Sequence, residues 1–87
     1  MINRRSEFEV IGKILDLSKN GARKTEILYK GNFSYNQLTN YLNLLLKNEI
    51  LEEKRKQEDG NNTKSYYITQ KGQDLLGNIN KTLSFLK

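Results

Sequence analysis

The sequence predicts a small α+β fold that is mainly α, with a β-hairpin placed before the last of four helices. Three observations support this fold class. Apolar residues recur at helical spacing in several stretches, a short helix precedes a glycine-containing turn and a longer helix, and a cluster of turn residues separates two β-prone stretches. With 87 residues, the chain has room for one small domain (1–87) and no second core. Residues 1–5 are a candidate flexible arm.

The first helix is predicted over residues 6–19. Ser6 and Glu9 have the spacing of a capping box, in which each side chain accepts a hydrogen bond from a backbone N–H at the helix start. Val10 and Leu17 fall outside the apolar stripe of this helix, so we expect the helix to touch something on a second side. The stripe itself consists of Phe8, Ile11, Ile14, Leu15 and Ser18.

A short helix, a tight turn and a longer helix come next. Residues 22–24 are predicted to be extended, and Thr25 is predicted to cap the short helix. Residues 31–33 form the turn, and Ser34 opens the longer helix in a second capping box with Gln37. This order is helix-turn-helix organisation.

A hairpin and a last helix complete the chain. Residues 50–56 and 64–68 are β-prone and flank the turn cluster at residues 58–62. Thr69 then caps a final helix, predicted over residues 70–86. A helix-turn-helix followed directly by a hairpin is the winged helix-turn-helix arrangement, in which the hairpin is the wing.

The predicted helix over residues 34–47 has two faces of different chemistry. At 100° per residue, Leu38, Leu42 and Leu45 share the inner face. The opposite face carries short neutral side chains, where a solvent-facing helix would usually carry Glu, Lys and Arg. Because amides can pair with base edges in the DNA major groove, we interpret this helix as a recognition helix. Its candidate groove residues are Asn36, Thr39, Asn40, Asn43 and Lys47. The alternative is composition alone, since the whole chain is rich in Asn.

The net charge of +5 and the pI near 9.5 favour a polyanionic partner, either nucleic acid or an anionic membrane surface. The candidates for contact with the DNA backbone are Arg23, Lys24, Lys30, Tyr35, Lys54, Arg55, Lys56 and Lys64. The alternative for the hairpin lysines is that they are solvated surface charges, because lysines on a sheet edge often serve only to block pairing with another edge. Tyr35 could instead close the core. The acidic residues 58–59 argue against deep insertion of the wing tip into the minor groove.

The chain lacks Cys and His, which excludes disulfides, thiolate nucleophiles, imidazole bases and metal sites built on these residues. Carboxylates such as Glu52 and Glu53 sit beside lysines, as surface charges usually do. We therefore expect no enzymatic activity, cofactor or metal. No apolar run approaches the roughly 18 residues of a membrane span, and the final helix carries too few lysines for an interfacial membrane helix. We expect a cytoplasmic, nucleoid-associated protein without a small-molecule ligand.

The final helix carries more apolar residues than so small a domain can absorb. Leu75, Leu76 and Ile79 would pack onto the first helix, which leaves the following apolar residues exposed. An exposed apolar end usually marks an interface, so we hypothesise a homodimer, helped by Val10 and Leu17. The alternative is a terminus that folds back on its own domain. The candidate interface residues are Leu76, Leu83, Phe85 and Leu86.

Four short runs resemble the small archaeal winged-helix DNA-binding proteins, which include dimeric chromatin-associated proteins of thermophilic archaea and related transcriptional regulators. Each run is short, but their order and spacing are together fairly specific and extend over residues 6–80. The runs are Gly21-Ala22-Arg23-Lys24-Thr25, Asn32-Phe33-Ser34-Tyr35, Asn48-Glu49-Ile50-Leu51 and Tyr67-Ile68-Thr69-Gln70-Lys71-Gly72.

This resemblance implies binding of double-stranded DNA by a transcriptional regulator or chromatin-associated protein. The helix over residues 34–47 would lie in the major groove and the hairpin on the neighbouring backbone. In dimeric members a long C-terminal helix pairs with its counterpart, and the helix of this chain is shorter than their coiled coil. The alternative from a different class is a winged-helix protein-interaction module without DNA binding.

Overall fold

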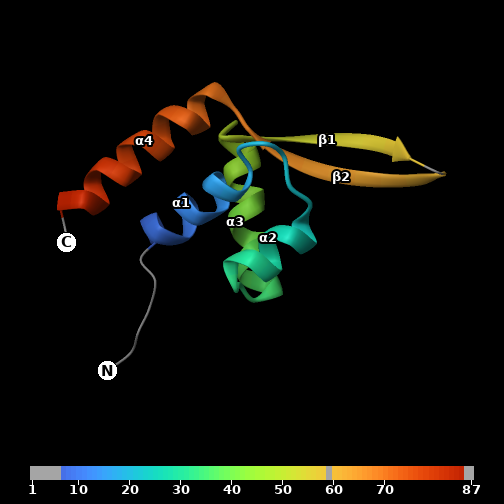
Figure 1. The fold of residues 1–87 in the computed structure, drawn as a ribbon, viewed down its shortest axis with the longest axis horizontal. Helices are drawn as coiled ribbons and strands as arrows, with labels where there is room; N and C mark the ends of the chain where they lie inside the picture. Colours follow the sequence, from blue (N-terminus) through green and yellow to red (C-terminus); the bar gives the residue numbers. More distant parts are fainter. Residues whose placement is uncertain (1–6, 59, 86–87) are drawn as a thin grey trace.

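The computed structural model describes residues 7–58 and 60–85, with the backbone alone for Lys56, Glu58 and Asn61. The elements are α1 (Glu7–Leu17), α2 (Lys24–Gly31), α3 (Tyr35–Lys47), β1 (Leu51–Glu58), β2 (Asn61–Ile68) and α4 (Gln70–Phe85), shown in Figure 1. The predicted fold class and the order of elements are therefore confirmed. The Ser6 half of the first capping box and the arm at residues 1–5 lie outside the described residues.

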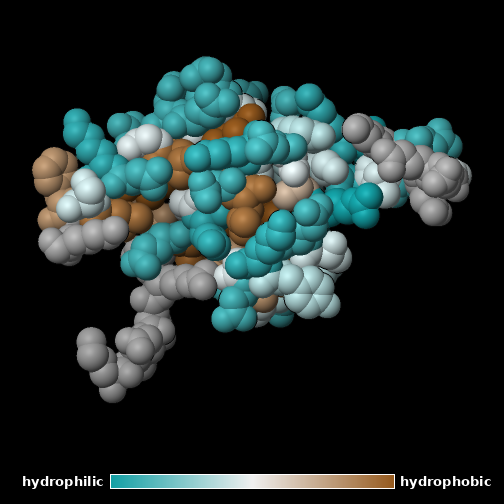
Figure 2. Space-filling model, viewed as in Figure 1, coloured by the Kyte–Doolittle hydropathy of each residue, from teal (hydrophilic) through white to brown (hydrophobic). Residues whose placement is uncertain are grey.

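The core lies between the helices and the base of the hairpin. Figure 1 shows α4 running alongside α1, while β1 and β2 project away from the helices. Figure 2 shows a largely hydrophilic surface, with hydrophobic residues reaching it near the end of α4. The buried apolar residues are Val10, Ile14, Leu15, Ala22, Ile27, Phe33, Leu38, Leu42, Leu45, Leu51, Tyr66, Ile68, Leu76 and Ile79.

Helix α1 buries a stripe that differs from the predicted one. Phe8 is half exposed, so its place in the predicted stripe was wrong. Val10 is only 1% exposed, and α1 contacts α2 as well as α4, so the predicted contact on a second side of α1 is confirmed. Ser18 is buried as predicted, and its hydroxyl donates to the Ile14 carbonyl oxygen (2.8 Å). The Ser18 carbonyl oxygen accepts from the Ile68 N–H (3.2 Å), which ties the end of α1 to β2.

Helix α2 begins two positions earlier than a cap at Thr25 allows. Arg23 is the N-cap residue, and its backbone N–H donates to the Glu26 carboxylate (3.2 Å). Thr25 lies within the first turn, so its predicted capping role was wrong. A carboxylate three residues after the cap satisfies a backbone donor here without a hydroxyl in the cap position.

The turn between α2 and α3 requires residues with little steric demand. Asn32 has a left-handed backbone (φ 55°), which Asn adopts more readily than most residues. The Phe33 N–H donates to the Leu28 carbonyl oxygen (3.2 Å) and closes the turn. A Cβ at Gly31 would overlap the Phe33 ring, so glycine lets this ring enter the core directly beneath α2.

Both ends of α3 are fixed by hydrogen bonds. Ser34 caps the helix as predicted, and its Oγ accepts from the Gln37 N–H (3.2 Å). At the other end Glu49 has a left-handed backbone (φ 60°), and the Ile50 N–H donates to the Leu45 carbonyl oxygen (2.9 Å). This is the bonding of a Schellman motif, in which glycine usually occupies the left-handed position.

Thr69 joins the end of α3 to the start of α4. Its hydroxyl donates to the Glu49 carbonyl oxygen (2.7 Å) and accepts from the Gly72 N–H (3.0 Å), which confirms Thr69 as the cap of α4. The Lys71 ammonium donates to the Asn48 carbonyl oxygen (2.9 Å), where the α3 dipole favours positive charge. The recognition-helix candidate and α4 are therefore held together directly.

The hairpin pairs β1 with β2 antiparallel, from Leu51 opposite Ile68 to Glu58 opposite Asn61. Both strands reach further toward the tip than predicted, so the turn is tighter than the cluster at residues 58–62 suggested. Ala22 pairs with Tyr66 through two backbone hydrogen bonds (3.0 and 2.8 Å). The predicted extended segment thus lies against the outer edge of β2.

Candidate nucleic-acid interface

The two predicted faces of α3 are present in the structure. Leu38, Leu42 and Leu45 are buried, while the opposite face exposes the predicted groove candidates other than Thr39. In the part of the chain that the structure describes, the three Asn amides on this face make no side-chain hydrogen bond with another residue. Their polar atoms are therefore available to an external partner. The exposed candidates are Asn36, Asn40, Asn43 and Lys47.

Leu44 also belongs to this outer face and was missed by the sequence reasoning. Its side chain is 47% exposed, although the three other leucines discussed above are buried. The helical angle could have identified it, because Leu44 lies about 80° from Asn36 and about 40° from Asn40 around the α3 axis. The face is therefore made of amides and one branched apolar side chain.

Thr39 has a role within the protein. Its hydroxyl donates to the Tyr35 carbonyl oxygen (2.8 Å) and accepts from the Lys24 ammonium (2.6 Å). The same ammonium lies 4.0 Å from the centroid of the Tyr35 ring. Lys24 and Thr39 thus connect the start of α2 to α3, and the Thr39 hydroxyl is already engaged. Tyr35 is 63% exposed, so the alternative that it closes the core was wrong.

The remaining α2 candidates lie at its two ends. Arg23 is exposed at the N-cap, and Lys30 is exposed in the last turn, where its ammonium lies 4.0 Å from the Glu26 carboxylate. Tyr29 is among the most exposed large side chains and was not singled out from the sequence. Positively charged side chains are therefore exposed at both ends of this short helix.

One face of the hairpin combines two cations with a carboxylate. Glu53 lies 3.6 Å from the Arg55 Nε and 3.9 Å from the Lys64 ammonium. Tyr66 lies opposite Glu53 in the hairpin register. Burial, then the Glu53 charge and then Tyr35 raise the pKa of Tyr66 above its ordinary value of 10.0. This face of the wing therefore carries two cations that share one carboxylate.

The other face of the hairpin carries Lys54. Its ammonium lies 3.4 Å from the Glu52 carboxylate and 4.8 Å from the centroid of the Tyr67 ring. The predicted cluster at residues 54–56 is therefore divided between the faces, because successive side chains of a strand point in opposite directions. The Lys56 side chain lies outside the described part of the structure.

The candidate interface residues on α4 differ in exposure. Leu76 is 5% exposed and belongs to the core of its own domain, so its place in a subunit interface was wrong. The same holds for Val10, which is buried between α1 and its neighbours. Leu83 is half-buried and Phe85 is 78% exposed, while Leu86 lies outside the described residues.

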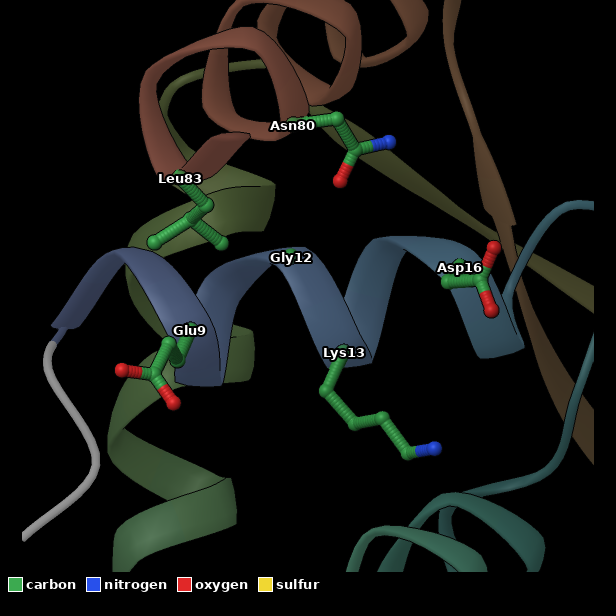
Figure 3. Close-up of a pocket in the computed structure, with 6 residues that line it drawn as sticks. All are labelled: Glu9, Gly12, Lys13, Asp16, Asn80 and Leu83. Carbon is green, nitrogen blue, oxygen red and sulfur yellow. The ribbon is translucent and has the colours of Figure 1, made fainter. Parts of the chain in front are cut away.

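A groove of about 450 Å³ runs between α1 and α4 (Figure 3). Charged side chains from α1 line one wall, and Leu83 with Asn80 from α4 lines the other. This groove lies on the α1–α4 side of the domain, whereas the candidates for contact with the DNA major groove lie on α3. Its lining residues are Glu9, Gly12, Lys13, Asp16, Asn80 and Leu83.

Residues 7–58 and 60–85 contain neither a candidate metal site nor a helix that could span a membrane. No group of three or more His, Cys, Asp or Glu side chains is arranged to hold a metal ion. No helix in these ranges has the length and apolar character needed to cross a membrane.

Comparison with known proteins agrees with this architecture. An uncharacterised protein of Methanocaldococcus jannaschii is 29% identical over 77 residues, which cover 87% of this chain and 71% of that protein. The crystal structure of Sso10a-2, a DNA-binding protein from Sulfolobus solfataricus, is 27% identical and superposes with a TM-score of 0.77, covering 93% of this chain and 81% of that one.

A Streptococcus mutans protein of known structure superposes with a TM-score of 0.87 at 20% identity, covering 99% of this chain and 86% of that one. This likeness concerns the fold alone. The resemblance to small archaeal winged-helix proteins is thus confirmed by the archaeal relative and by Sso10a-2. The match to the family described as winged helix-turn-helix extends over residues 4–87, and the chain belongs to that family.

Proposed function

We propose that this protein binds double-stranded DNA as a transcriptional regulator or chromatin-associated protein of the cytoplasm, in contact with the nucleoid. The observation that carries the proposal is the outer face of α3, where Asn36, Asn40 and Asn43 expose unpaired amides above a fully apolar inner face. The net charge of +5 adds the attraction to a polyanion. Sso10a-2, a relative with the same fold, is itself described as a DNA-binding protein.

In this proposal α3 lies in the major groove and the wing lies along the flanking backbone. Arg55 and Lys64 on one face of the hairpin, and Lys54 on the other, reach phosphates. Arg23 and Lys30 at the ends of α2 contact phosphates of the DNA strand opposite the one that the wing contacts. Contacts to phosphate supply most of the affinity and no sequence information, while the amides of α3 supply base preference.

A titration of a random-sequence duplex at low and moderate salt tests the proposal. We expect affinity to fall as salt rises, because each neutralised phosphate releases counterions, and the logarithmic slope is about −0.9 per contact. Fluorescence anisotropy of a labelled duplex measures both the affinity and the slope. Failure to bind any duplex at micromolar protein and low salt would contradict DNA binding and favour a protein-interaction module.

The double variant Lys54→Ala/Arg55→Ala tests the role of the wing. Affinity should fall on every sequence alike, and the salt slope should decrease by about 2, because two phosphate contacts are lost. Lys13→Ala/Lys81→Ala is the matched control, since both lysines are exposed, lie on α1 and α4 rather than on the hairpin, and their replacement also removes two positive charges. An equal loss in the control would show that only net charge matters.

We propose further that the protein is a homodimer joined through the end of α4. Phe85 is the most exposed apolar side chain of that helix, and the half-buried Leu83 lies two residues before it. Phe8 is half exposed at the start of α1, and α1 lies beside α4. We expect a second copy to cover the exposed side chains of Phe8 and Phe85, and to meet the charged groove between these helices beside Leu83.

Sedimentation equilibrium tests the homodimer. The wild type should have twice the monomer mass of 10.2 kDa at micromolar concentration. Phe85→Asp should shift the mass toward the monomer, because a carboxylate would be buried without a partner. Tyr29→Asp is the matched control, since Tyr29 is an equally exposed aromatic residue on α2. A concentration-independent monomer in the wild type would rule out the dimer.

A further inference from the structure

Leu44 occupies the position on α3 that would face the bases if this helix lies in the major groove. It follows Asn43 directly and lies one turn after Asn40, on the same exposed face. The stretch from Asn36 to Lys47 spans about 16 Å at 1.5 Å per residue, the length of roughly five base pairs. A face of this length presents its side chains to several consecutive bases.

The side chains of this face match the edge of one kind of base pair. Adenine offers an acceptor at N7 and a donor at N6, which an Asn amide can engage together, and thymine offers a C5-methyl group to apolar side chains. Guanine offers two acceptors, which Arg or Lys engages best. The described outer face of α3 holds three asparagine amides, the exposed Gln37 beside the exposed Leu44, and no arginine, with its one lysine at the last position.

On the basis of the proposed DNA binding, we infer that α3 prefers A·T over G·C pairs in the major groove, with Leu44 as the residue that contacts the thymine methyl group. The amides of Asn40 and Asn43, about 40° and 100° from Leu44 around the α3 axis, take the adenine edge of the same or the adjoining pairs. Leu44 is therefore a specificity-determining residue, while Leu42 and Leu45 on either side of it serve the core.

A preference for A·T pairs could also arise in the minor groove, because A·T tracts narrow it and attract basic side chains. The two sources can be separated chemically. Replacing thymine by uracil removes the C5-methyl group from the major groove and leaves the minor-groove acceptors unchanged. Replacing cytosine by 5-methylcytosine adds a methyl group at the equivalent place in a G·C pair.

The experiment compares four duplexes of equal length by anisotropy, an A·T duplex, its uracil form, a G·C duplex and its 5-methylcytosine form. The wild type should bind the A·T duplex at least about fivefold more tightly than the G·C duplex. Uracil should weaken binding to the A·T duplex about three- to fivefold for each methyl group contacted. 5-Methylcytosine should strengthen binding to the G·C duplex, because it adds a methyl group in the major groove.

Two variants assign the effect to side chains. Leu44→Ala should bind the thymine and uracil duplexes equally, and because Leu44 is exposed the variant should keep the wild-type melting temperature. Asn43→Ala should lower the preference for A·T but keep the response to uracil. A response to uracil that persists in Leu44→Ala would overturn the role of this residue.

The failure of the inference and the failure of DNA binding give different results. Equal affinity for all four duplexes would leave DNA binding intact and overturn the preference for A·T. A preference for A·T that does not change with uracil would show that no thymine methyl group is contacted, and would overturn the inferred role of Leu44. Binding to none of the four duplexes would remove the proposed function itself.

Discussion

The Lys24 ammonium donates a 2.6 Å hydrogen bond to the Thr39 hydroxyl and lies against the Tyr35 ring, so the first residue of α2 is locked onto the second turn of α3. Hydrogen bonds that involve a charged group are stronger than neutral ones, and this group is half-buried. The angle between the two helices of the helix-turn-helix therefore depends on a polar contact as well as on the core.

Lys24→Ala should lower the free energy of unfolding by about 1–2 kcal/mol, because it removes a charge-assisted hydrogen bond. Lys30→Ala is the control, since the 4.0 Å ion pair of Lys30 is exposed and should contribute less than about 0.5 kcal/mol. Urea denaturation measures both. With Thr39→Val added, the double variant should lose less stability than the two single variants combined. Simple additivity would show that the two side chains do not interact.

Glu49→Gly should stabilise the protein by about 1 kcal/mol. Glu49 has a positive φ of 60° at the end of α3, a conformation that costs a non-glycine residue about 1–2 kcal/mol, partly offset by the greater freedom of glycine in the unfolded chain. Thermal unfolding followed by circular dichroism would detect the change. Glu52→Gly is the control, because Glu52 lies within β1, where glycine should destabilise. A loss of stability in Glu49→Gly would contradict the assigned backbone strain.

Glu53→Gln should strengthen binding to any duplex by up to about fivefold. The Glu53 carboxylate lies near both Arg55 and Lys64, and removing its charge leaves both cations free for phosphate. The salt slope should become steeper at the same time. Glu26→Gln is the control, because its carboxylate lies near only one cation, at 4.0 Å. Unchanged affinity in Glu53→Gln would show that this wing face does not approach DNA.

Stability should fall at alkaline pH in a way that depends on Tyr66. Burial, Glu53 and Tyr35 raise the pKa of Tyr66 in the folded protein above its ordinary value of 10.0. The unfolded chain therefore loses this proton first, so the contribution to stability is complete below about pH 10 and is lost as the pH rises through the raised value. Denaturant titrations at about pH 9 and pH 11 should show a smaller decrease for Tyr66→Phe than for the wild type. Tyr29→Phe, at an exposed position, should behave as the wild type does.

The sequence predicts the elements well because local signals specify them. Ser34 and Thr69 cap α3 and α4 in the structure, and the leucine spacing of α3 places its amides outside. The errors occur where packing between elements decides. Val10 is buried because α1 has neighbours on two sides, and Leu76 is buried because α4 lies along α1. The sequence pattern predicted a second contact for α1 and the packing of Leu76 onto it, but not that this packing would bury both side chains and leave neither for a second subunit.

The sequence predicted the candidate DNA-binding site only in part, because local geometry sets some of its features and packing between elements sets the others. The exposure of the amide face follows from helical geometry, but the use of Thr39 by Lys24 depends on where α2 meets α3. The separation of Lys54 from Arg55 follows from strand alternation and could have been anticipated. The proximity of Glu53 to Lys64 depends on the hairpin register, which the turn sequence alone did not specify.

The hydrogen bonds of Thr69 have a consequence for the length of DNA that a dimer would occupy. Because this residue joins the end of α3 to the first turn of α4, the direction of α4 relative to α3 is set inside each subunit. Pairing of two α4 helices would then hold the two α3 helices at one separation. The number of base pairs between two half-sites would be a fixed property of the protein, and Thr69→Val would broaden the range of spacings that it accepts.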